Sequence, residues 1–261
     1  MTTDVVLTEV ADRIGTVTLN RPEARNALNI ELRRTLPAVL AAMDADDEVD
    51  VVILTGSDPA FCAGLDLREL GSGQNRIGGR QDGGADGVGP FATRTKPLIG
   101  AVNGPAITGG FELALNCDFL IASTRARFAD THARVGVMPG WGLTVLLADA
   151  IGVRKAREMS LTGNFLTAEE ALHWGLVNHV VEHDALLPTA RRIAQDIIGN
   201  DQPGVRQMLA TYEAVNGTTV SDGWAVEARM AQEWTANGID PATVEARRAR
   251  IIERGRGQLG T

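Results

Sequence analysis

The sequence has few lysines, few cysteines and no long hydrophobic run. Lys96 and Lys155 are the two lysines among 25 basic residues, so nearly all of the positive charge is arginine. Cys62 and Cys117 are too few for a disulfide framework and lack metal-ligand spacing, which favours a reducing, cytoplasmic location. The longest apolar run, 38–43, has six residues, whereas a membrane-spanning helix needs about 20. We therefore expect no membrane partner.

The charge balance is acidic. The 261 residues include 25 Lys and Arg against 33 Asp and Glu, a formal net charge of −8 that argues against a nucleic-acid partner. Hydrophobic residues make up 44% and charged residues 22%, as in ordinary globular proteins. The length suits one large domain or one domain with a helical appendage. The N-terminus lacks a basic leader, so we expect no secretory signal.

The pattern of apolar residues predicts a parallel sheet with crossover helices. Residues 5–10 and 16–20 are rich in β-branched side chains and are expected to form two strands joined by a turn. The apolar runs 51–54, 98–102 and 119–122 suit strands buried on both faces. Helical character between the last two runs, at residues 109–117, indicates a strand-helix-strand crossover.

A helix is expected to begin after Asn29, because Asn is a favoured N-cap residue. Apolar residues then recur at helical spacing on one face, at Leu32, Leu36, Val39, Leu40 and Met43. Pro37 lies within this stretch and is expected either to kink the helix or to delay its start.

Two segments differ in composition from the rest. Residues 71–90 contain eight glycines in twenty positions and predict a loop, either an inert insertion or an active-site lid. From residue 201 the chain is helical in pattern and strongly charged, which divides it into a core, 1–200, and a C-terminal helical region, 201–261. One helical stripe in that region favours a core or a subunit interface and consists of Trp224, Ala228, Ala231 and Trp234.

Three glycine-rich segments lie at the ends of predicted strands, at 60–67, 102–113 and 136–142. Each alone is compatible with a simple tight turn. The sequence has no Walker A motif and no G-x-G-x-x-G in a strand-to-helix turn, so nucleotide hydrolysis and dinucleotide binding lack support. It also has no G-x-S-x-G elbow, which argues against an ordinary α/β-hydrolase.

The pair Gly109-Gly110 is a candidate for binding a carbonyl oxygen. Glycines that open a helix expose backbone N–H groups and let a ligand approach closely. Such donors suit a carbonyl oxygen that gains negative charge, and each donor in an oxyanion hole is worth about 3–4 kcal/mol. Glu112 lies in the first turn of the same helix, where it is either a functional carboxylate or a residue favoured by the helix dipole.

Seven segments in this order resemble the crotonase superfamily, also called the enoyl-CoA hydratase/isomerase family. The first is LNRPEARNAL at 19–28, close to the family's opening pattern LNRPxxxNAL. The others are VILTG at 52–56, FCAGLDL at 61–67, KPLIGAVNG at 96–104, CD at 117–118, LTAEEA at 166–171 and GLV at 175–177. Together they cover nearly the whole chain.

This resemblance implies an α/β fold, a spiral of β-β-α units with a C-terminal helical region used in forming a trimer or a dimer of trimers. It implies an acyl-CoA thioester substrate and no metal or organic cofactor other than coenzyme A as part of that substrate. Two backbone N–H groups would polarise the thioester carbonyl, and the motifs place them at Ala63 and Gly109. The coenzyme A moiety would lie along the opening motif and the turn after the third strand, at Ala24, Arg25, Leu65 and Asp66.

The chain departs from the family pattern at one catalytic position. Family hydratases use two glutamates to hold the water and move its proton, and the first falls on Glu112. The second position holds His132, four residues before the glycine that opens the segment 136–142. A histidine is an acid or base near neutral pH, but its geometry differs from that of a carboxylate. Thr108 also replaces the small residue that usually precedes the glycine pair.

The residues and the resemblance leave three functions open. The first is hydration of a 2-trans-enoyl-CoA, with Glu112 as base and His132 assisting. The second is another enolate reaction of the family, such as isomerisation, decarboxylation or thioester hydrolysis, and the third is acyl-CoA binding without turnover. Retention of Glu112 favours an enzyme. We interpret Cys62 as a packing residue, and the remaining histidines as local structural groups rather than metal ligands, at positions His173, His179 and His183.

Overall fold

The structure is a computed structural model that describes residues 4–71, 89–236 and 241–259. The chain forms two compact units, Met1–Arg206 and Gln207–Thr261. The domain boundary predicted after residue 200 stays a prediction, because compactness does not show that either part folds alone. Most of the glycine-rich segment predicted as a loop, residues 72–88, lies outside the described residues.

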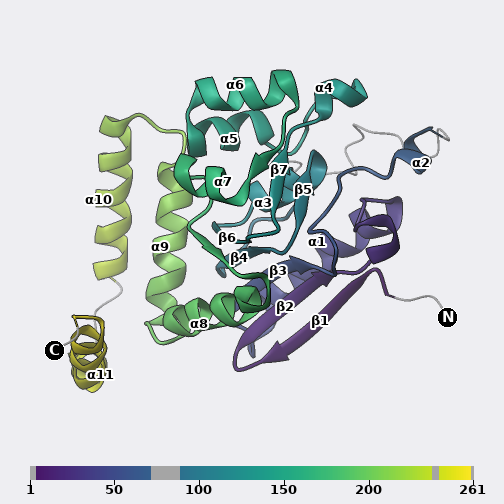
Figure 1. The fold of residues 1–261 in the computed structure, drawn as a ribbon. Coiled ribbons are helices and arrows are strands. Elements are labelled where there is room, and N and C mark those ends of the chain that lie inside the picture. The colour runs from purple at the N-terminus through teal and green to yellow at the C-terminus, as the bar shows by residue number, and fades with distance from the viewer. Residues whose placement is uncertain (1–3, 72–88, 237–240, 260–261) are drawn as a thin grey trace. The chain divides into compact units, whose positions relative to one another are not determined.

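The first unit is built on a six-stranded sheet in the order β1-β2-β3-β4-β6-β9 (Figure 1). The first two strands pair antiparallel as a hairpin, and every other neighbouring pair is parallel. This confirms the predicted parallel sheet and its crossover connections. The strands are β1 (Val6–Ala11), β2 (Ile14–Leu19), β3 (Val51–Gly56), β4 (Leu98–Val102), β6 (Phe119–Ser123) and β9 (His179–Val181).

A smaller sheet of three strands has the order β5-β7-β8. Its strand β5 (Pro105–Ile107) is parallel to β7 (Arg127–Ala129), which pairs antiparallel with β8 (Leu166–Thr167). The helix α3 (Gly109–Leu115) follows β5, and α4 (His132–Val135) follows β7. Because β5 and β7 are parallel, both helices begin at the same edge of this sheet.

The helix α1 (Ile30–Ala45) begins where the sequence predicts it. The Asn29 side chain is its N-cap and accepts a hydrogen bond of 2.8 Å from the Leu32 backbone N–H. Pro37 lies inside the helix, and the helix already starts at Ile30, so the alternative of a delayed start is wrong. Leu32 and Leu36 are buried from this helix into the core.

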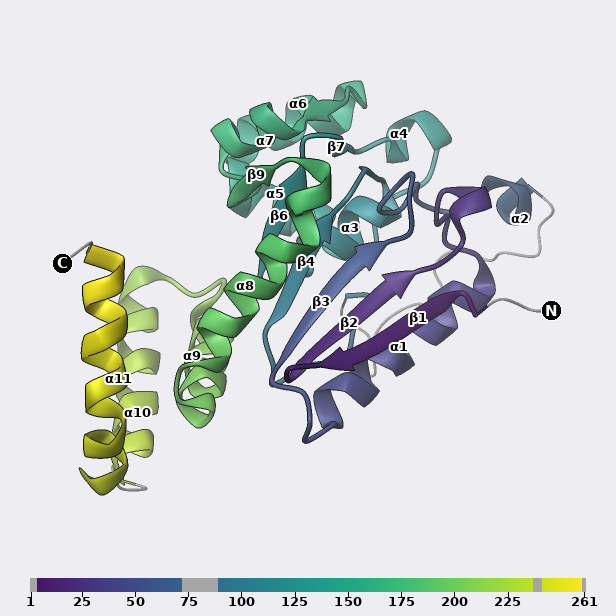
Figure 2. The ribbon, with the colours of Figure 1, turned by 60° about the horizontal axis from the view of Figure 1, so that its bottom comes forward.

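The large sheet separates two hydrophobic clusters, because successive side chains of a strand point to opposite faces. Val52 and Leu54 of β3 belong to the larger cluster with residues of α1, whereas Val51 and Ile53 face the second cluster. The helix α8 (Leu186–Ile198) covers that second face through Leu186, Ala190 and Ala194. Figure 2 shows α8 and α1 with the sheet between them. All six residues of β3 are buried, as predicted for a strand covered on both faces.

The remaining elements are short helices around the sheets and three longer helices at the C-terminal end. In the described part of the chain, no helix is long and apolar enough to cross a membrane. The short helices are η1 (Pro22–Ala24), α2 (Leu67–Gly71), α5 (Leu143–Ile151), α6 (Val153–Thr162), α7 (Ala168–Trp174) and η2 (His183–Ala185). The three longer helices are α9 (Gln202–Val215), α10 (Val220–Ala236) and α11 (Pro241–Leu259).

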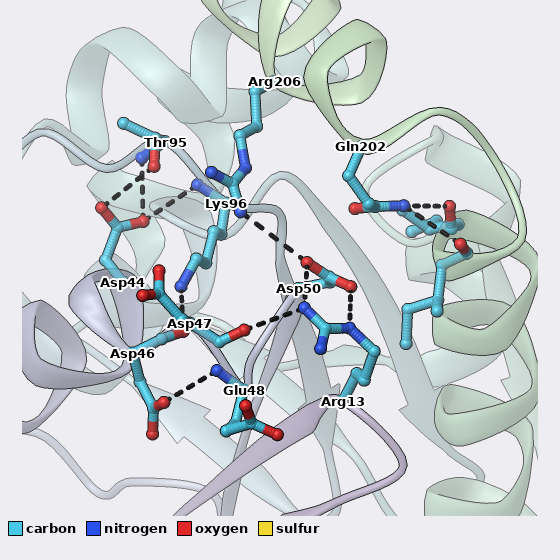
Figure 3. A network of polar contacts seen from close by, with 12 residues as sticks. Arg13, Asp44, Asp46, Asp47, Glu48, Asp50, Thr95, Lys96, Gln202 and Arg206 are labelled. Atoms are coloured by element: carbon cyan, nitrogen blue, oxygen red, sulfur yellow. Dashed lines mark hydrogen bonds and ion pairs between the residues drawn. The ribbon is translucent and has the colours of Figure 1, made fainter. Parts of the chain in front are cut away.

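Within the first unit, a polar network joins the start of α9 to the residues that precede β2 and β3 (Figure 3). The buried Asp50 carboxylate pairs with Arg13 through two contacts and lies 3.7 Å from the Arg206 guanidinium. Side-chain hydrogen bonding from Arg13 outweighs burial and lowers the pKa of Asp50. Nearby, the Lys96 ammonium donates to the carbonyls of Met43 and Asp46 at 3.1 and 2.6 Å. Lys96 therefore satisfies carbonyl groups at the C-terminal end of α1.

Candidate active site

The loop after β3 lies against the start of α3. Cys62 bridges Ala106 of β5, with hydrogen bonds from the Cys62 N–H to the Pro105 carbonyl at 3.0 Å and from the Ile107 N–H to the Cys62 carbonyl at 2.9 Å. Gly64 has a φ of +90°, and a Cβ there would lie 2.8 Å from the Ile107 carbonyl oxygen and 3.6 Å from the Gly109 nitrogen. Only glycine fits this turn, which brings the two predicted donor segments together.

The structure corrects one of the predicted donors. The Ala63 N–H donates to the Arg25 carbonyl at 3.0 Å and is therefore occupied. The bridge between Leu28 and Leu65 is made by the Gly64 carbonyl and the Asp66 N–H, so it does not use the Leu65 N–H. Among the described residues, the amides of Leu65 and Gly109 have no backbone acceptor. The pair of donors offered to a ligand is thus Leu65 and Gly109, not Ala63 and Gly109.

The glycine pair allows this close approach. A Cβ on Gly110 would overlap the Cys62 carbonyl oxygen and lie 2.7 Å from its carbon. A Cβ on Gly109 would lie 3.0 Å from Leu28 Cδ1 and 3.8 Å from Trp141 Cζ3. The indole of Trp141 and the side chain of Leu28 therefore lie close to the Gly109 α-carbon.

Thr108 precedes the pair in a strained backbone conformation, with φ 53° and ψ −115°. A β-branched residue at positive φ is an outlier that persists only where the surroundings fix it. Here the Thr108 N–H donates to the Ala129 carbonyl at 2.9 Å, and its hydroxyl hydrogen-bonds to that of Thr131 at 2.5 Å. The threonine that departs from the family pattern thus links the start of α3 to the segment that carries His132.

Glu112 is 3% exposed and points from the first turn of α3 toward two partners. Its Oε1 accepts the Trp141 backbone N–H at 2.7 Å, and its Oε2 lies 3.5 Å from His132 Nε2. The two residues chosen from the family pattern as acid and base groups therefore meet in the structure. Trp141 follows α4 in the segment 136–142, so that glycine-rich segment also takes part in the site.

His132 opens α4 and is 4% exposed. Its Nδ1 lies 2.6 Å from Asp130 Oδ1, and the same oxygen accepts the His132 backbone N–H at 3.1 Å. Burial by itself lowers the pKa of His132, but hydrogen bonds to Asp130 and Glu112 outweigh it and raise that pKa to about 9. For Asp130 burial acts in the opposite direction and raises the pKa. Hydrogen bonds from His132 and Ser160 outweigh burial and bring the pKa of Asp130 below its ordinary value.

The residues expected to contact coenzyme A lie beside the same loop. Ala24 ends η1, and Arg25 follows it in a left-handed conformation with φ 52° and is exposed. Asp66 pairs with Arg21 at 3.1 Å, so its carboxylate already has a cationic partner. Leu65 is brought to this edge by its bridge with Leu28. The structure thus places all four predicted positions on adjoining segments, and their contact with coenzyme A stays a prediction.

Two further expectations concern cysteine and histidine. Cys62 is fully buried, and burial raises the pKa of its thiol to about 12, so its interpretation as a packing residue is confirmed. His183 hydrogen-bonds to Ser123 at 3.1 Å and to Asp58 at 2.9 Å, which accounts for both ring nitrogens. No group of three or more His, Cys, Asp or Glu in the described ranges is arranged to hold a metal ion.

Sequence reasoning missed Asp130, the Trp141 backbone and the Leu65 amide. Asp130 was detectable in principle, since a carboxylate two residues before a histidine can reach back to its ring. The Trp141 contact joins residues 29 positions apart, and no local pattern predicts it. Whether the Leu65 amide can bind a ligand depends on which neighbouring amides are already hydrogen-bonded. Their partners lie in the segment 25–28, which is distant in sequence.

The chain belongs to the Enoyl-CoA hydratase/isomerase family, whose pattern matches residues 9–241. It is 48% identical to the probable peroxisomal enoyl-CoA hydratase 1 of Arabidopsis thaliana over 72% of this chain and 71% of that one. It is 41% identical to a probable enoyl-CoA hydratase of Rhizobium meliloti over 89% and 90% of the two chains. The crystal structure of an enoyl-CoA hydratase from Mycobacterium tuberculosis H37Rv superposes with a TM-score of 0.76 at 52% identity, covering 89% of this chain and 100% of that one.

Proposed function

We propose that the protein is an enoyl-CoA hydratase, a hydro-lyase that adds water across the double bond of a 2-trans-enoyl-CoA. The observation that carries this proposal is the meeting of Glu112 and His132 at 3.5 Å in a buried site. Beside it lie the amides of Leu65 and Gly109, which have no backbone acceptor among the described residues. Several relatives named as enoyl-CoA hydratases, at 37–48% identity, support the same activity.

The chemistry follows from the charges at the site. The thioester carbonyl accepts hydrogen bonds from Leu65 and Gly109, so negative charge can develop on its oxygen. Glu112 removes a proton from water while the water oxygen bonds to C3 and the double-bond electrons move to that thioester oxygen as an enolate. The enolate then collapses and C2 takes a proton from His132. The proton on Glu112 passes to His132, which restores both groups.

The coenzyme A part of the substrate is proposed to lie along Ala24, Arg25, Leu65 and Asp66. Arg25 is exposed next to this edge, so its guanidinium is accessible to a phosphate of the ligand. Because Asp66 is paired with Arg21, its contribution is to order the loop rather than to offer a free carboxylate. No metal or further organic cofactor is needed for the steps above.

We also propose a homotrimer or a dimer of trimers in the cytoplasm. The helices of residues 207–261 expose large apolar side chains, including Trp224, which is 72% exposed in the single chain. Large apolar side chains exposed in this number on one helical region are typical of a protein interface.

The proposal is tested by the loss of enoyl-thioester absorbance with crotonyl-CoA and with a longer 2-enoyl-CoA. We expect turnover by the wild type and a loss of about 10²-fold or more in His132→Ala, because a group that moves a proton contributes that much. His132→Glu next to Asp130 would create a pair of like charges, so Asp130→Asn/His132→Glu is the matched variant.

The opposite result would favour the second candidate, a different acyl-CoA reaction on the same oxyanion site. That result would be an inactive wild type together with hydration by the Asp130→Asn/His132→Glu variant. The observation that favours this candidate is the imidazole at the second glutamate position of family hydratases.

A further inference from the structure

Three buried ionisable groups form a line through the site. Asp130, His132 and Glu112 are 2%, 4% and 3% exposed and come from the segment after β7, from α4 and from α3. The line runs from Asp130 Oδ1 to His132 Nδ1 at 2.6 Å and from His132 Nε2 to Glu112 Oε2 at 3.5 Å. Nothing in the resemblance to the family assigns a function to Asp130.

We propose that Asp130 is a positioning residue, which keeps His132 as the proton donor of the hydration by holding Nδ1–H and turning Nε2–H toward Glu112. This inference rests on the proposed function and deepens it. It divides the work of the two groups, since Glu112 accepts the proton of water and His132 supplies the proton to C2.

The geometry fixes the ring in two ways. Asp130 Oδ1 accepts both the backbone N–H and the ring Nδ1–H of His132, at 3.1 and 2.6 Å, which anchors the residue at two points. A carboxylate is only an acceptor, so the bonded Nδ1 must carry the hydrogen. The other ring nitrogen, Nε2, is then the one that faces Glu112.

The charges around the ring favour the proton-donating form. The ionisable groups that face His132 are Asp130 on its own segment and Glu112 on α3, and both are acidic. The Ser160 side chain of α6 donates a hydrogen bond to Asp130 that stabilises the carboxylate. Burial works against the imidazolium, yet the two carboxylates raise the pKa of His132 to about 9. His132 is therefore charged at neutral pH and loses its proton only as the pH rises through about 9.

Each turnover returns Glu112 and His132 to their starting protonation states. Water gives one proton to Glu112 and its oxygen to C3, and His132 gives one proton from Nε2 to C2. Glu112 then carries a proton and His132 is neutral, so transfer across the 3.5 Å between them restores the starting state. A negatively charged residue in place of His132 would first have to gain a proton before it could donate one.

The test compares Asp130→Asn and Asp130→Glu with the wild type in the pH profile of crotonyl-CoA hydration. Asn keeps a hydrogen-bond acceptor but removes the charge, so we expect the alkaline limb to move from about pH 9 toward 6.5, the ordinary value for histidine. We expect kcat at pH 8 to fall about 10–100-fold with KM within about threefold. Asp130→Glu restores the charge and should keep the alkaline limb near that of the wild type.

A matched control exists in the second Asp–His pair of the chain, Asp58 and His183, which are 2.9 Å apart. Asp58→Asn should leave the alkaline limb unchanged. An unmoved alkaline limb in a folded Asp130→Asn, or an equal shift in Asp58→Asn, would overturn the inference.

A ¹⁵N NMR titration of His132, assigned with His132→Ala, separates this inference from the proposed function. We expect His132 to titrate near pH 9 in the wild type and at least one unit lower in Asp130→Asn, even if crotonyl-CoA is not a substrate. An inactive wild type with this shift would reject hydration and retain the positioning by Asp130. An unshifted titration would reject the positioning whatever the activity.

Discussion

Glu112 is held at two points, and each leaves it suited to a different task. Its Oε1 accepts the Trp141 backbone N–H at 2.7 Å, which fixes the carboxylate plane. Its Oε2 faces the imidazole of His132, a group that is cationic at neutral pH. Oε2 is therefore the oxygen that the proposed reaction uses as the base. One residue thereby combines a structural anchor with a reactive oxygen.

Replacing Glu112 with Gln separates these two tasks. Gln still offers an oxygen to the Trp141 N–H but cannot take a proton from water, so we expect kcat for crotonyl-CoA to fall about 10²–10⁴-fold. Affinity for 3-hydroxybutyryl-CoA, measured by calorimetry, should stay within about threefold. Glu169→Gln, on the exposed start of α7, is the control and should change neither quantity. Equal losses of rate and affinity in Glu112→Gln would instead make Glu112 structural.

The site shows which residues a sequence can predict. Glu112, His132 and Gly109 follow from the family's motif positions, since each lies at a short, fixed spacing from a glycine along the chain. Ala63 does not, because its amide is bonded to the Arg25 carbonyl, which lies in another segment. Whether a backbone donor is free depends on the whole hydrogen-bond pattern around it, and spacing along the chain does not record that pattern.

At the scale of elements, the start of α3 is packed against the loop after β3 without room for a side chain. This contact brings the Gly109 amide close to the turn at Gly64. The strand β3, which precedes the loop, was predictable, as was β4, because both are buried throughout and appear as apolar runs. The strands β5, β7 and β8 were not predicted, because elements of two or three residues are stabilised by long-range pairing rather than by local pattern.

Gly110→Ala tests this packing. The added methyl group would overlap the Cys62 carbonyl, and backbone atoms cannot move aside cheaply, so we expect a loss of about 2 kcal/mol or more in unfolding free energy. This corresponds to a melting temperature lower by roughly 4–8 °C in a calorimetric scan. Hydration should fall as well, since the Gly109 amide would be displaced.

Gly140→Ala is the control for that experiment, because a Cβ at Gly140 meets nothing within 4 Å. We expect its melting temperature to stay within about 1 °C of the wild type. A Gly110→Ala protein as stable as Gly140→Ala would show that the loop and α3 are not tightly packed against each other.

At the scale of the whole molecule, the described residues of the C-terminal unit, 207–261, contribute nothing to the two hydrophobic clusters of the fold. Its large apolar side chains are instead exposed in the single chain, among them Met208, Tyr212, Val220, Trp224, Ile251 and Ile252. A helical unit that buries so little apolar surface of its own lacks a sufficient source of stability. The sequence left two alternatives open for the stripe that carries Trp224, a core or a subunit interface, and the exposure of Trp224 in the single chain favours the second.

Trp224 provides the sharpest test of the proposed trimer. It is 72% exposed on α10, and burying an aromatic side chain of this size at a subunit interface would contribute a large share of the association energy. We expect the wild type to sediment at three or six times the chain mass of 27.7 kDa and Trp224→Glu to shift toward 27.7 kDa at micromolar concentration. Glu227→Gln, also exposed on α10, should leave the mass unchanged. If Trp224→Glu keeps the wild-type mass, or the wild type is monomeric, then this face of α10 does not join subunits and the unit 207–261 must obtain its stability in another way.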